Sequence, residues 1–302
     1  MKFNTKCVHG SGRPDSTGAI SPAIYMSSTF SHPKLGDTTG YQYTRESNPT
    51  RARLEQLIAG LEDGKDALAF SSGMAAVDAV FHLFSPGDHI ILGDDLYGGS
   101  IRMFTNIYEQ NGIEFTYVGT SDLDAVKAAF KPNTKAVYIE TPTNPMMEIT
   151  DIRALCALAH ERNALVIIDN TFLSPYFQKP LTLGADIVVH SGTKFIGGHH
   201  DVISGFTIVK DDELAAKLRL TYKTVGACLS AMDSWLVIRG VKTLALRMEQ
   251  HQKNAIALAE WLKKQPKVTK VLFPGLREHP GYEINKAQTT GFGGMLSFEV
   301  DS

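Results

Sequence analysis

The stretch Asp186-Ile-Val-Val-His190-Ser191-Gly-Thr-Lys194 joins a short apolar run to a turn that contains hydroxyls, a glycine and a lysine. Continuous Val and Ile runs are typical of buried parallel strands. In sheets of such strands, ligands bind beyond the carboxyl ends of the strands. The stretch therefore predicts one strand of a parallel sheet, with a ligand site in the turn at residues 191–194.

Outward from this stretch, short apolar runs alternate with helical patterns between about residue 44 and residue 210. This alternation predicts the α/β class, with a mostly parallel seven-stranded sheet and helices on both faces. Helices are expected at 73–84 and 152–162, and one long amphipathic helix from 233 to 264. The expected strands lie at 66–70, 89–93, 115–119, 136–140, 165–169, 187–190 and 206–209, with two more at 268–273 and 294–300.

The composition divides the chain into three parts. Residues 1–43 are rich in Ser, Pro, Thr and Gly without a sustained period, which predicts an extended arm of the kind that lies on a neighbouring subunit. Residues 44–232 are predicted to form the large ligand-binding domain. Residues 233–302 are expected to begin a smaller C-terminal α+β domain.

With 302 residues, 43% of them hydrophobic and 21% charged, the chain can bury a sizeable core. Its formal net charge of -2 gives no electrostatic basis for binding nucleic acid or an anionic membrane, so a small-molecule partner is expected. No apolar run is long enough to cross a bilayer. Cys7, Cys156 and Cys228 match no metal-binding spacing and favour a reducing cytoplasm.

Lys194 and its neighbours have the chemistry to hold pyridoxal phosphate (PLP). The aldehyde of this cofactor condenses with a lysine amine, and its phosphate needs short hydroxyl donors and unobstructed backbone nearby. Lys194 would supply the amine, and Ser191 and Thr193 the donors. The same pattern also occurs on ordinary exposed loops, so the rest of the chain has to support this interpretation.

A second candidate phosphate contact is Ser72-Gly73-Met74, between a predicted strand and a predicted helix. The N-terminus of a helix favours an anion, because its unpaired N–H groups and its dipole both attract negative charge. Ser72 could donate through its hydroxyl, and Gly73 allows close approach. The alternative is an ordinary turn in which Ser72 only caps the helix.

Asp169 and Tyr97 each follow a predicted strand and are candidates to contact the cofactor ring. A desolvated carboxylate at position 169 would keep the pyridine nitrogen protonated, so that the ring accepts the electrons released at the substrate Cα. Alternatively, Asp169 simply caps the next turn. Tyr97 could stack on the ring and act as an acid or a base.

Arg102, one helical turn after Tyr97, could hold a substrate carboxylate bidentately, or could be plain helix surface. His199, His200 and Asp201 suggest a metal site. Adjacent histidines rarely converge on one ion, however, and no other cluster accompanies them, so no metal is expected. The absence of G-x-G-x-x-G and Walker patterns argues against a nucleotide-binding module.

Five segments carry a resemblance to a known family: Ser191-Gly-Thr-Lys194-x4-His199-x-Asp201, Asp169-Asn-Thr, Ser72-Gly-Met74, Tyr97-Gly-Gly and Tyr43-Thr-Arg45-x3-Asn48-Pro49-Thr50. They are similar to the Cys/Met metabolism family of PLP enzymes, which includes cystathionine β-lyase, γ-synthase and γ-lyase and methionine γ-lyase. The resemblance covers essentially the whole chain in the expected order. It implies an aspartate aminotransferase-like (type I) fold.

By this resemblance Lys194 carries the cofactor, Asp169 pairs with its ring nitrogen, and Tyr97 stacks on its ring. Asn144 is implied to contact the cofactor or the substrate, and Arg102 to bind the distal carboxylate of a sulfur amino acid such as cystathionine. The implied phosphate contacts are Ser72, Gly73, Met74, Ser191 and Thr193.

The resemblance also implies that active sites are shared between subunits. Tyr43 and Arg45 would reach the phosphate of the neighbouring subunit, which makes the active unit a homodimer, usually paired into a homotetramer. Relatives continue through a C-terminal domain that bears an arginine for the substrate α-carboxylate, and this sequence ends before such a segment. Residues 1–302 are therefore expected to be a fragment or to lack that clamp, and to turn over slowly alone.

Two positions bear on the choice among family members. Methionine γ-lyases resemble a Tyr-Gly-Cys pattern where this chain has Tyr97-Gly98-Gly99, and many γ-acting members have proline where it has Ala231. The resemblance thus favours β-elimination of cystathionine to homocysteine, pyruvate and ammonia. Cystathionine γ-synthase or γ-lyase activity is the alternative, and a non-catalytic PLP-binding homologue is the alternative of another class.

Overall fold

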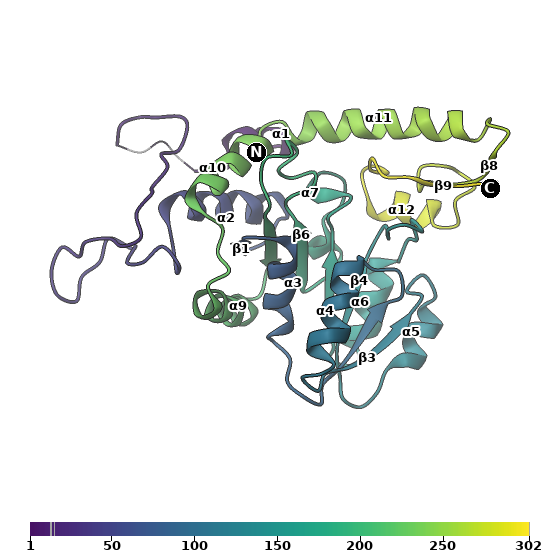
Figure 1. Ribbon diagram of the computed structural model, residues 1–302, viewed down its shortest axis with the longest axis horizontal. Helices are drawn as coiled ribbons and strands as arrows, with labels where there is room; N and C mark the ends of the chain where they lie inside the picture. Colours follow the sequence, from purple (N-terminus) through teal and green to yellow (C-terminus); the bar gives the residue numbers. More distant parts are fainter. Residues whose placement is uncertain (13, 15, 302) are drawn as a thin grey trace. The chain divides into compact units, whose positions relative to one another are not determined.

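The computed structural model describes residues 1–12, 14 and 16–301 (Figure 1). Seven strands form one sheet in the order β1-β7-β6-β5-β4-β2-β3. β2 pairs in parallel with β3 and β4, and β4 with β5, whereas β1 is antiparallel to β7. The predicted α/β class and mostly parallel sheet are therefore confirmed. The strands are β1 (Asp66–Phe70), β2 (His89–Gly93), β3 (Glu114–Val118), β4 (Thr134–Glu140), β5 (Leu165–Asp169), β6 (Ile187–Ser191) and β7 (Gly205–Val209).

The chain forms two compact units. The first contains Met1–Leu83 and Val189–Ala245, and the second contains Phe84–Val188 and the residues from Leu246 onward. The units are groups of residues that contact one another in space. They do not test the domain boundaries expected from the sequence, so those boundaries stay a prediction.

In the first unit, helices cover β1 and β7. The helix α2 packs against β1 and against α10, while α3 packs against β7. The α2 helix begins where the buried Asn48 side chain accepts hydrogen bonds from the N–H groups of Thr50 and Arg51, which satisfies two of the helix's first donors. The helices are α1 (Phe3–His9), α2 (Pro49–Leu61), α3 (Gly73–Phe81), α9 (Asp212–Val225) and α10 (Ala231–Val241).

Most of the predicted arm lacks regular structure. Figure 1 shows the purple segment before α2 leading away from the helices of the first unit. The helix α1 at its start was not predicted, and it is only seven residues long. The arm is nevertheless tied to its unit at its base, because the Asn48 amide donates to the Tyr25 carbonyl (2.9 Å) and the Trp235 indole donates to the Pro22 carbonyl (3.1 Å).

In the second unit, the apolar faces of four parallel strands and two helices form a common core. Buried Val and Ile side chains of β2, β4 and β5 pack with side chains of α6, and the buried Val126 and partly buried neighbours on α5 complete the cluster. Asp151 caps α6 by accepting from the Ala154 N–H (3.0 Å). The helices are α4 (Gly98–Met103), the π-helical turn η1 (Phe104–Tyr108), α5 (Leu123–Ala129), α6 (Ile152–His160), α7 (Ser174–Phe177), α8 (Pro180–Leu183) and α12 (Tyr282–Gln288), and β8 (Val268–Leu272) pairs with β9 (Ser297–Val300).

The prediction of one long helix over residues 233–264 is wrong. α10 ends at Val241, and a separate helix, α11 (Leu244–Leu262), follows. At the break, both the N–H and the hydroxyl of Thr243 donate to the Gly240 carbonyl (3.2 and 3.1 Å), a local turn that competes with continued helical bonding. Among the described residues, no helix is long and apolar enough to cross a membrane.

Candidate active site

The N-terminus of α3 is the first part of the candidate site. β1 ends at Phe70, and the chain turns through Ser71 and Ser72 into the helix. The Ser72 hydroxyl accepts from the Ala75 N–H (3.0 Å), so Ser72 does cap the helix, and its predicted phosphate contact stays a prediction. Capping leaves the amides of Gly73 and Met74 at the positive end of a nine-residue helix, where an anion is favoured.

Gly73 allows Ser191 to approach this helix end. A Cβ atom at position 73 would lie 2.9 Å from the Cβ of Ser191 and 3.1 Å from its Oγ, which no side chain tolerates without displacement. Gly205, at the start of β7, is equally close-packed, since a Cβ there would lie 2.1 Å from the Ser72 carbonyl oxygen. The two segments predicted to contact phosphate, 72–74 and 191–194, therefore meet at one place in the first unit.

The turn that carries Lys194 is held by its own backbone and by Ser204. The Lys194 N–H donates to the Ser191 carbonyl (3.2 Å), and the Lys194 side chain is exposed. The Thr193 hydroxyl donates to the Ser204 carbonyl (3.2 Å) and accepts from the Ser204 N–H (3.1 Å). Thr193 thus braces the turn, and its hydroxyl proton is engaged with the protein. The types of donor gathered here, serine hydroxyls and the amides of a helix N-terminus, are those that bind phosphate.

In the second unit, Asp169 ends β5 and is surrounded by hydroxyl donors. It accepts from the N–H of Thr171 (3.0 Å) and from its hydroxyl (2.5 Å), so the local turn foreseen as an alternative does form. The buried Tyr138 hydroxyl also bonds to Asp169. Burial, together with the charges of Asp169 and Glu140, raises the pKa of Tyr138 well above its ordinary value, so this phenol stays a donor. Such donors favour the ionised form of Asp169, as a pyridinium partner requires.

Glu140 is a buried acid that the sequence analysis missed as a site residue. It ends β4 directly opposite Asp169 on β5, and only 6% of it is exposed. Its Oε2 accepts from the backbone N–H of Tyr97 (3.1 Å). Burial, reinforced by the charge of Asp169, raises the pKa of Glu140 to about 9. The signal in the sequence was an acidic residue at the end of a buried apolar run, one strand away from Asp169.

The other residues predicted in this unit lie near the same sheet edge or on the helix that follows it. Tyr97 precedes α4 and is 53% exposed, which leaves its ring available for stacking. Its ring is close to Gly99, where a Cβ would lie 2.4 Å from Tyr97 Cε1. Arg102 is exposed on α4, and Asn144 is half-buried in the loop after β4.

Tyr43 and Arg45 belong to the first unit, at the base of the arm. The Arg45 guanidinium lies 5.4 Å from the centre of the Tyr43 ring and donates to the Lys223 carbonyl. Both side chains are exposed. Their predicted contact with a neighbouring subunit stays a prediction.

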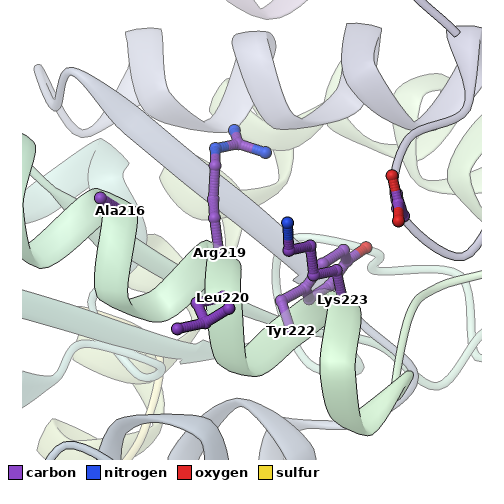
Figure 2. Close-up of a pocket in the computed structure, with 6 residues that line it drawn as sticks. Ala216, Arg219, Leu220, Tyr222 and Lys223 are labelled. Atoms are coloured by element: carbon purple, nitrogen blue, oxygen red, sulfur yellow. The ribbon is translucent and has the colours of Figure 1, made fainter.

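A hollow of about 390 Å³ lies along α9 in the first unit (Figure 2). Figure 2 shows Arg219 and Lys223 projecting from the same side of that helix. Arg219 is already engaged, since its Nε donates to Asp66 (2.6 Å). No residue predicted from the sequence lines the hollow, whose walls also include Glu46, Ala216, Leu220 and Tyr222. Within the described part of the chain, no three His, Cys, Asp or Glu side chains are grouped so as to hold a metal ion.

Comparisons with known proteins agree with this geometry. The family model described as "Cys/Met metabolism PLP-dependent enzyme" matches residues 4–302. The cystathionine γ-lyase of Bacillus subtilis is 50% identical over 303 residues, which cover 100% of this chain and 80% of that protein. The cystathionine β-lyase of Lactococcus lactis subsp. cremoris is also 50% identical, over 99% of this chain and 79% of that protein.

A solved structure supports the fold. The crystal structure of cystathionine γ-lyase from Lactobacillus plantarum complexed with L-serine superimposes with a TM-score of 0.98 at 50% identity, covering 100% of this chain and 79% of that chain. A family match over nearly the whole sequence, together with two relatives at half identity, confirms the resemblance inferred from the motifs. The chain belongs to the Cys/Met metabolism family of PLP-dependent enzymes.

Proposed function

We propose that this enzyme cleaves the carbon–sulfur bond of cystathionine, with β-elimination favoured over γ-chemistry. The observation that carries the proposal is the meeting of Ser72, Gly73 and Ser191 at the N-terminus of α3, next to the turn that presents Lys194. The names of the relatives at 50% identity supply the substrate class, because one is a cystathionine γ-lyase and the other a cystathionine β-lyase.

The proposed roles follow the position of each residue. Lys194 would hold the cofactor through its amine, and the same amine would take the proton from the substrate Cα. Bound PLP supplies the ring that accepts the electron pair left at Cα. Asp169 keeps the ring nitrogen protonated, and Tyr97 stacks on the ring. Phosphate is bound by Ser72, Gly73, Met74 and Ser191, with Thr193 as the brace of the turn.

Substrate contacts and the balance of the reaction complete the proposal. Arg102 binds the distal carboxylate of cystathionine, and Asn144 contacts the cofactor or substrate. In β-elimination the Cβ–S bond breaks, the sulfur leaves with the bonding electrons and takes up a proton as homocysteine, and the three-carbon remainder hydrolyses to pyruvate and ammonia. γ-Chemistry requires a second proton to leave from Cβ, a task that Lys194 and Tyr97 would have to share.

The close contact at Gly99 favours β-elimination over methionine γ-lyase activity. A side chain there would displace the Tyr97 ring from its present position, because a Cβ would lie 2.4 Å from that ring. We further propose a homodimer or homotetramer in which Tyr43 and Arg45 serve the neighbouring subunit, and a cytoplasmic location.

The proposal is tested by incubating the protein with PLP and L-cystathionine. Homocysteine with pyruvate marks β-elimination, cysteine with 2-oxobutyrate marks γ-elimination, and cystathionine made from an activated homoserine marks the synthase. Lys194→Ala should lose both the yellow absorption and the borohydride-fixed adduct, whereas the exposed Lys210→Ala should keep both. A protein that binds PLP but forms none of these products would be the non-catalytic homologue.

A further inference from the structure

Glu140 is a buried carboxyl group to which the proposed reaction assigns no role. It is the last residue of β4, and the two residues that precede it, Tyr138 and Ile139, are buried. Its Oε2 accepts from the Tyr97 N–H at 3.1 Å. Tyr97 is the residue from which α4 starts, so this hydrogen bond fixes the backbone that carries the Tyr97 ring.

The register of the sheet places Glu140 beside Asp169. β4 and β5 run parallel, and the Cα atoms of the two acids are direct partners across the strands. Opposed residues on neighbouring parallel strands point to the same face and lie about 5 Å apart. Two carboxylates on such paired positions, away from water, repel each other strongly enough that one of them is held neutral.

The hydrogen bonds identify which acid is neutral. Asp169 is bonded to three donors, the N–H and hydroxyl of Thr171 and the hydroxyl of Tyr138, and each favours its ionised form. Glu140 is bonded to a single backbone N–H, and it also faces the negative charge of Asp95 from the loop after β2. The groups that act on Glu140 are thus Asp169 on β5, Asp95 and the Tyr97 N–H on that loop, and Tyr138 on its own strand.

We propose that Glu140 is a positioning residue that, as a neutral carboxylic acid, holds the Tyr97 amide and leaves the negative charge of the acid pair on Asp169. The inference rests on the proposed function, because it gives Glu140 a role through two residues that contact the cofactor ring. Glu140 would then position Tyr97, which stacks on the ring, and keep the negative charge on Asp169, which pairs with the ring nitrogen. The direction of its pKa, raised by burial to about 9, agrees with a neutral group at physiological pH.

The test uses the holoenzyme with Glu140→Gln and Glu140→Leu, and Glu114→Gln as the matched control. Glu114 lies on β3 of the same sheet, where it is exposed and paired with Lys131. Two measurements are made on each protein: the affinity for PLP, by titration of the cofactor-free form, and the infrared carboxylic-acid band, assigned by carbon-13 labelling of glutamate. Circular dichroism checks that each variant is folded.

The wild type should show a carboxylic-acid band that titrates with a midpoint near pH 9 and is absent from Glu140→Gln. Glu140→Gln keeps an acceptor oxygen and should bind PLP within about twofold of the wild type, whereas Glu140→Leu should lose about fivefold through one lost hydrogen bond. Glu114→Gln should keep the band. If Glu140→Leu does not fold, the infrared band of the wild type and the PLP affinity of Glu140→Gln still test the inference.

Two results would overturn the inference: a wild-type spectrum without a Glu140 acid band at pH 7, or a Glu140→Gln protein that loses as much PLP affinity as Glu140→Leu. Either would mean that Glu140 is ionised or that its acceptor oxygen is irrelevant. A wild-type protein that takes up no PLP would instead overturn the proposed function, while the infrared band would still report the protonation of Glu140.

Discussion

Glu55 gives the sharpest prediction on stability, because it is a buried acid whose surroundings are fully described. It lies on α2 with 11% of its side chain exposed, and it accepts from the Ala69 N–H (3.2 Å) and the Tyr222 hydroxyl (3.4 Å). Arg51 and Arg219 approach it at 3.8 and 3.9 Å. Burial nevertheless outweighs both arginines and raises the pKa of Glu55 from 4.5 to about 7.

The direction of this shift fixes how stability changes with pH. Because the folded state holds the proton more tightly than the unfolded chain, the stabilisation is fully present below pH 4.5 and is lost as pH rises through about 7. A shift of about 2.5 pKa units corresponds to about 3.4 kcal/mol in total, at about 1.36 kcal/mol per unit. Between pH 5.5 and pH 8 the same relation gives a loss of about 2 kcal/mol.

The assay is urea unfolding of the wild type and Glu55→Gln at several pH values from 5.5 to 8. Gln cannot titrate, so the difference between the two free energies of unfolding should shift by about 2 kcal/mol across this range, in favour of Glu55→Gln at the higher pH. Glu213→Gln on α9, whose side chain is 77% exposed, should run parallel to the wild type. Equal pH slopes for wild type and Glu55→Gln would refute the reasoning.

Three further predictions concern single residues. Gly73→Ala should weaken PLP binding by about tenfold in an apoenzyme titration, because the added Cβ displaces Ser191 from its present position. An unchanged affinity for PLP would contradict the proposed phosphate contact of Ser191. Gly99→Ala should weaken PLP binding by up to about tenfold through lost stacking of Tyr97, whereas Gly98→Ala, with nothing within 4 Å, should not. Arg51→Met should lower the free energy of unfolding by about 3 kcal/mol in urea, because this buried guanidinium donates to three backbone carbonyls; a loss under 1 kcal/mol would contradict its bracing role.

The sheet could be predicted from the sequence because several of its strands are nearly continuous in apolar residues. The interiors of β2, β4 and β5 are fully buried, so composition alone marks them, and their bounds fall within two residues of those predicted. The break at Thr243 could not be predicted in the same way. The apolar spacing runs through it without interruption, and only the local hydrogen bonds to Gly240 end α10 there.

The site residues also differ in how far the sequence could predict them. Lys194, Ser72 and Asp169 were predicted because residue type and position after a strand already suggest their chemistry, which needs no knowledge of a neighbour. The engagement of the Thr193 hydroxyl by Ser204 was not predictable, since it depends on a partner eleven residues away folding back onto the turn.

Buried acids show most clearly why residue type alone is insufficient. Glu62 and His190 are both fully buried and lie 2.6 Å apart, although 128 residues separate them in the chain. Glu140 and Asp169 become neighbours only through the register of β4 and β5. In the first pair the partner is a base and in the second it is another acid, so a buried glutamate is paired in one place and held neutral in the other. Which partner each buried glutamate meets is therefore a property of strand pairing and helix packing, which the order of residues determines only through the completed fold.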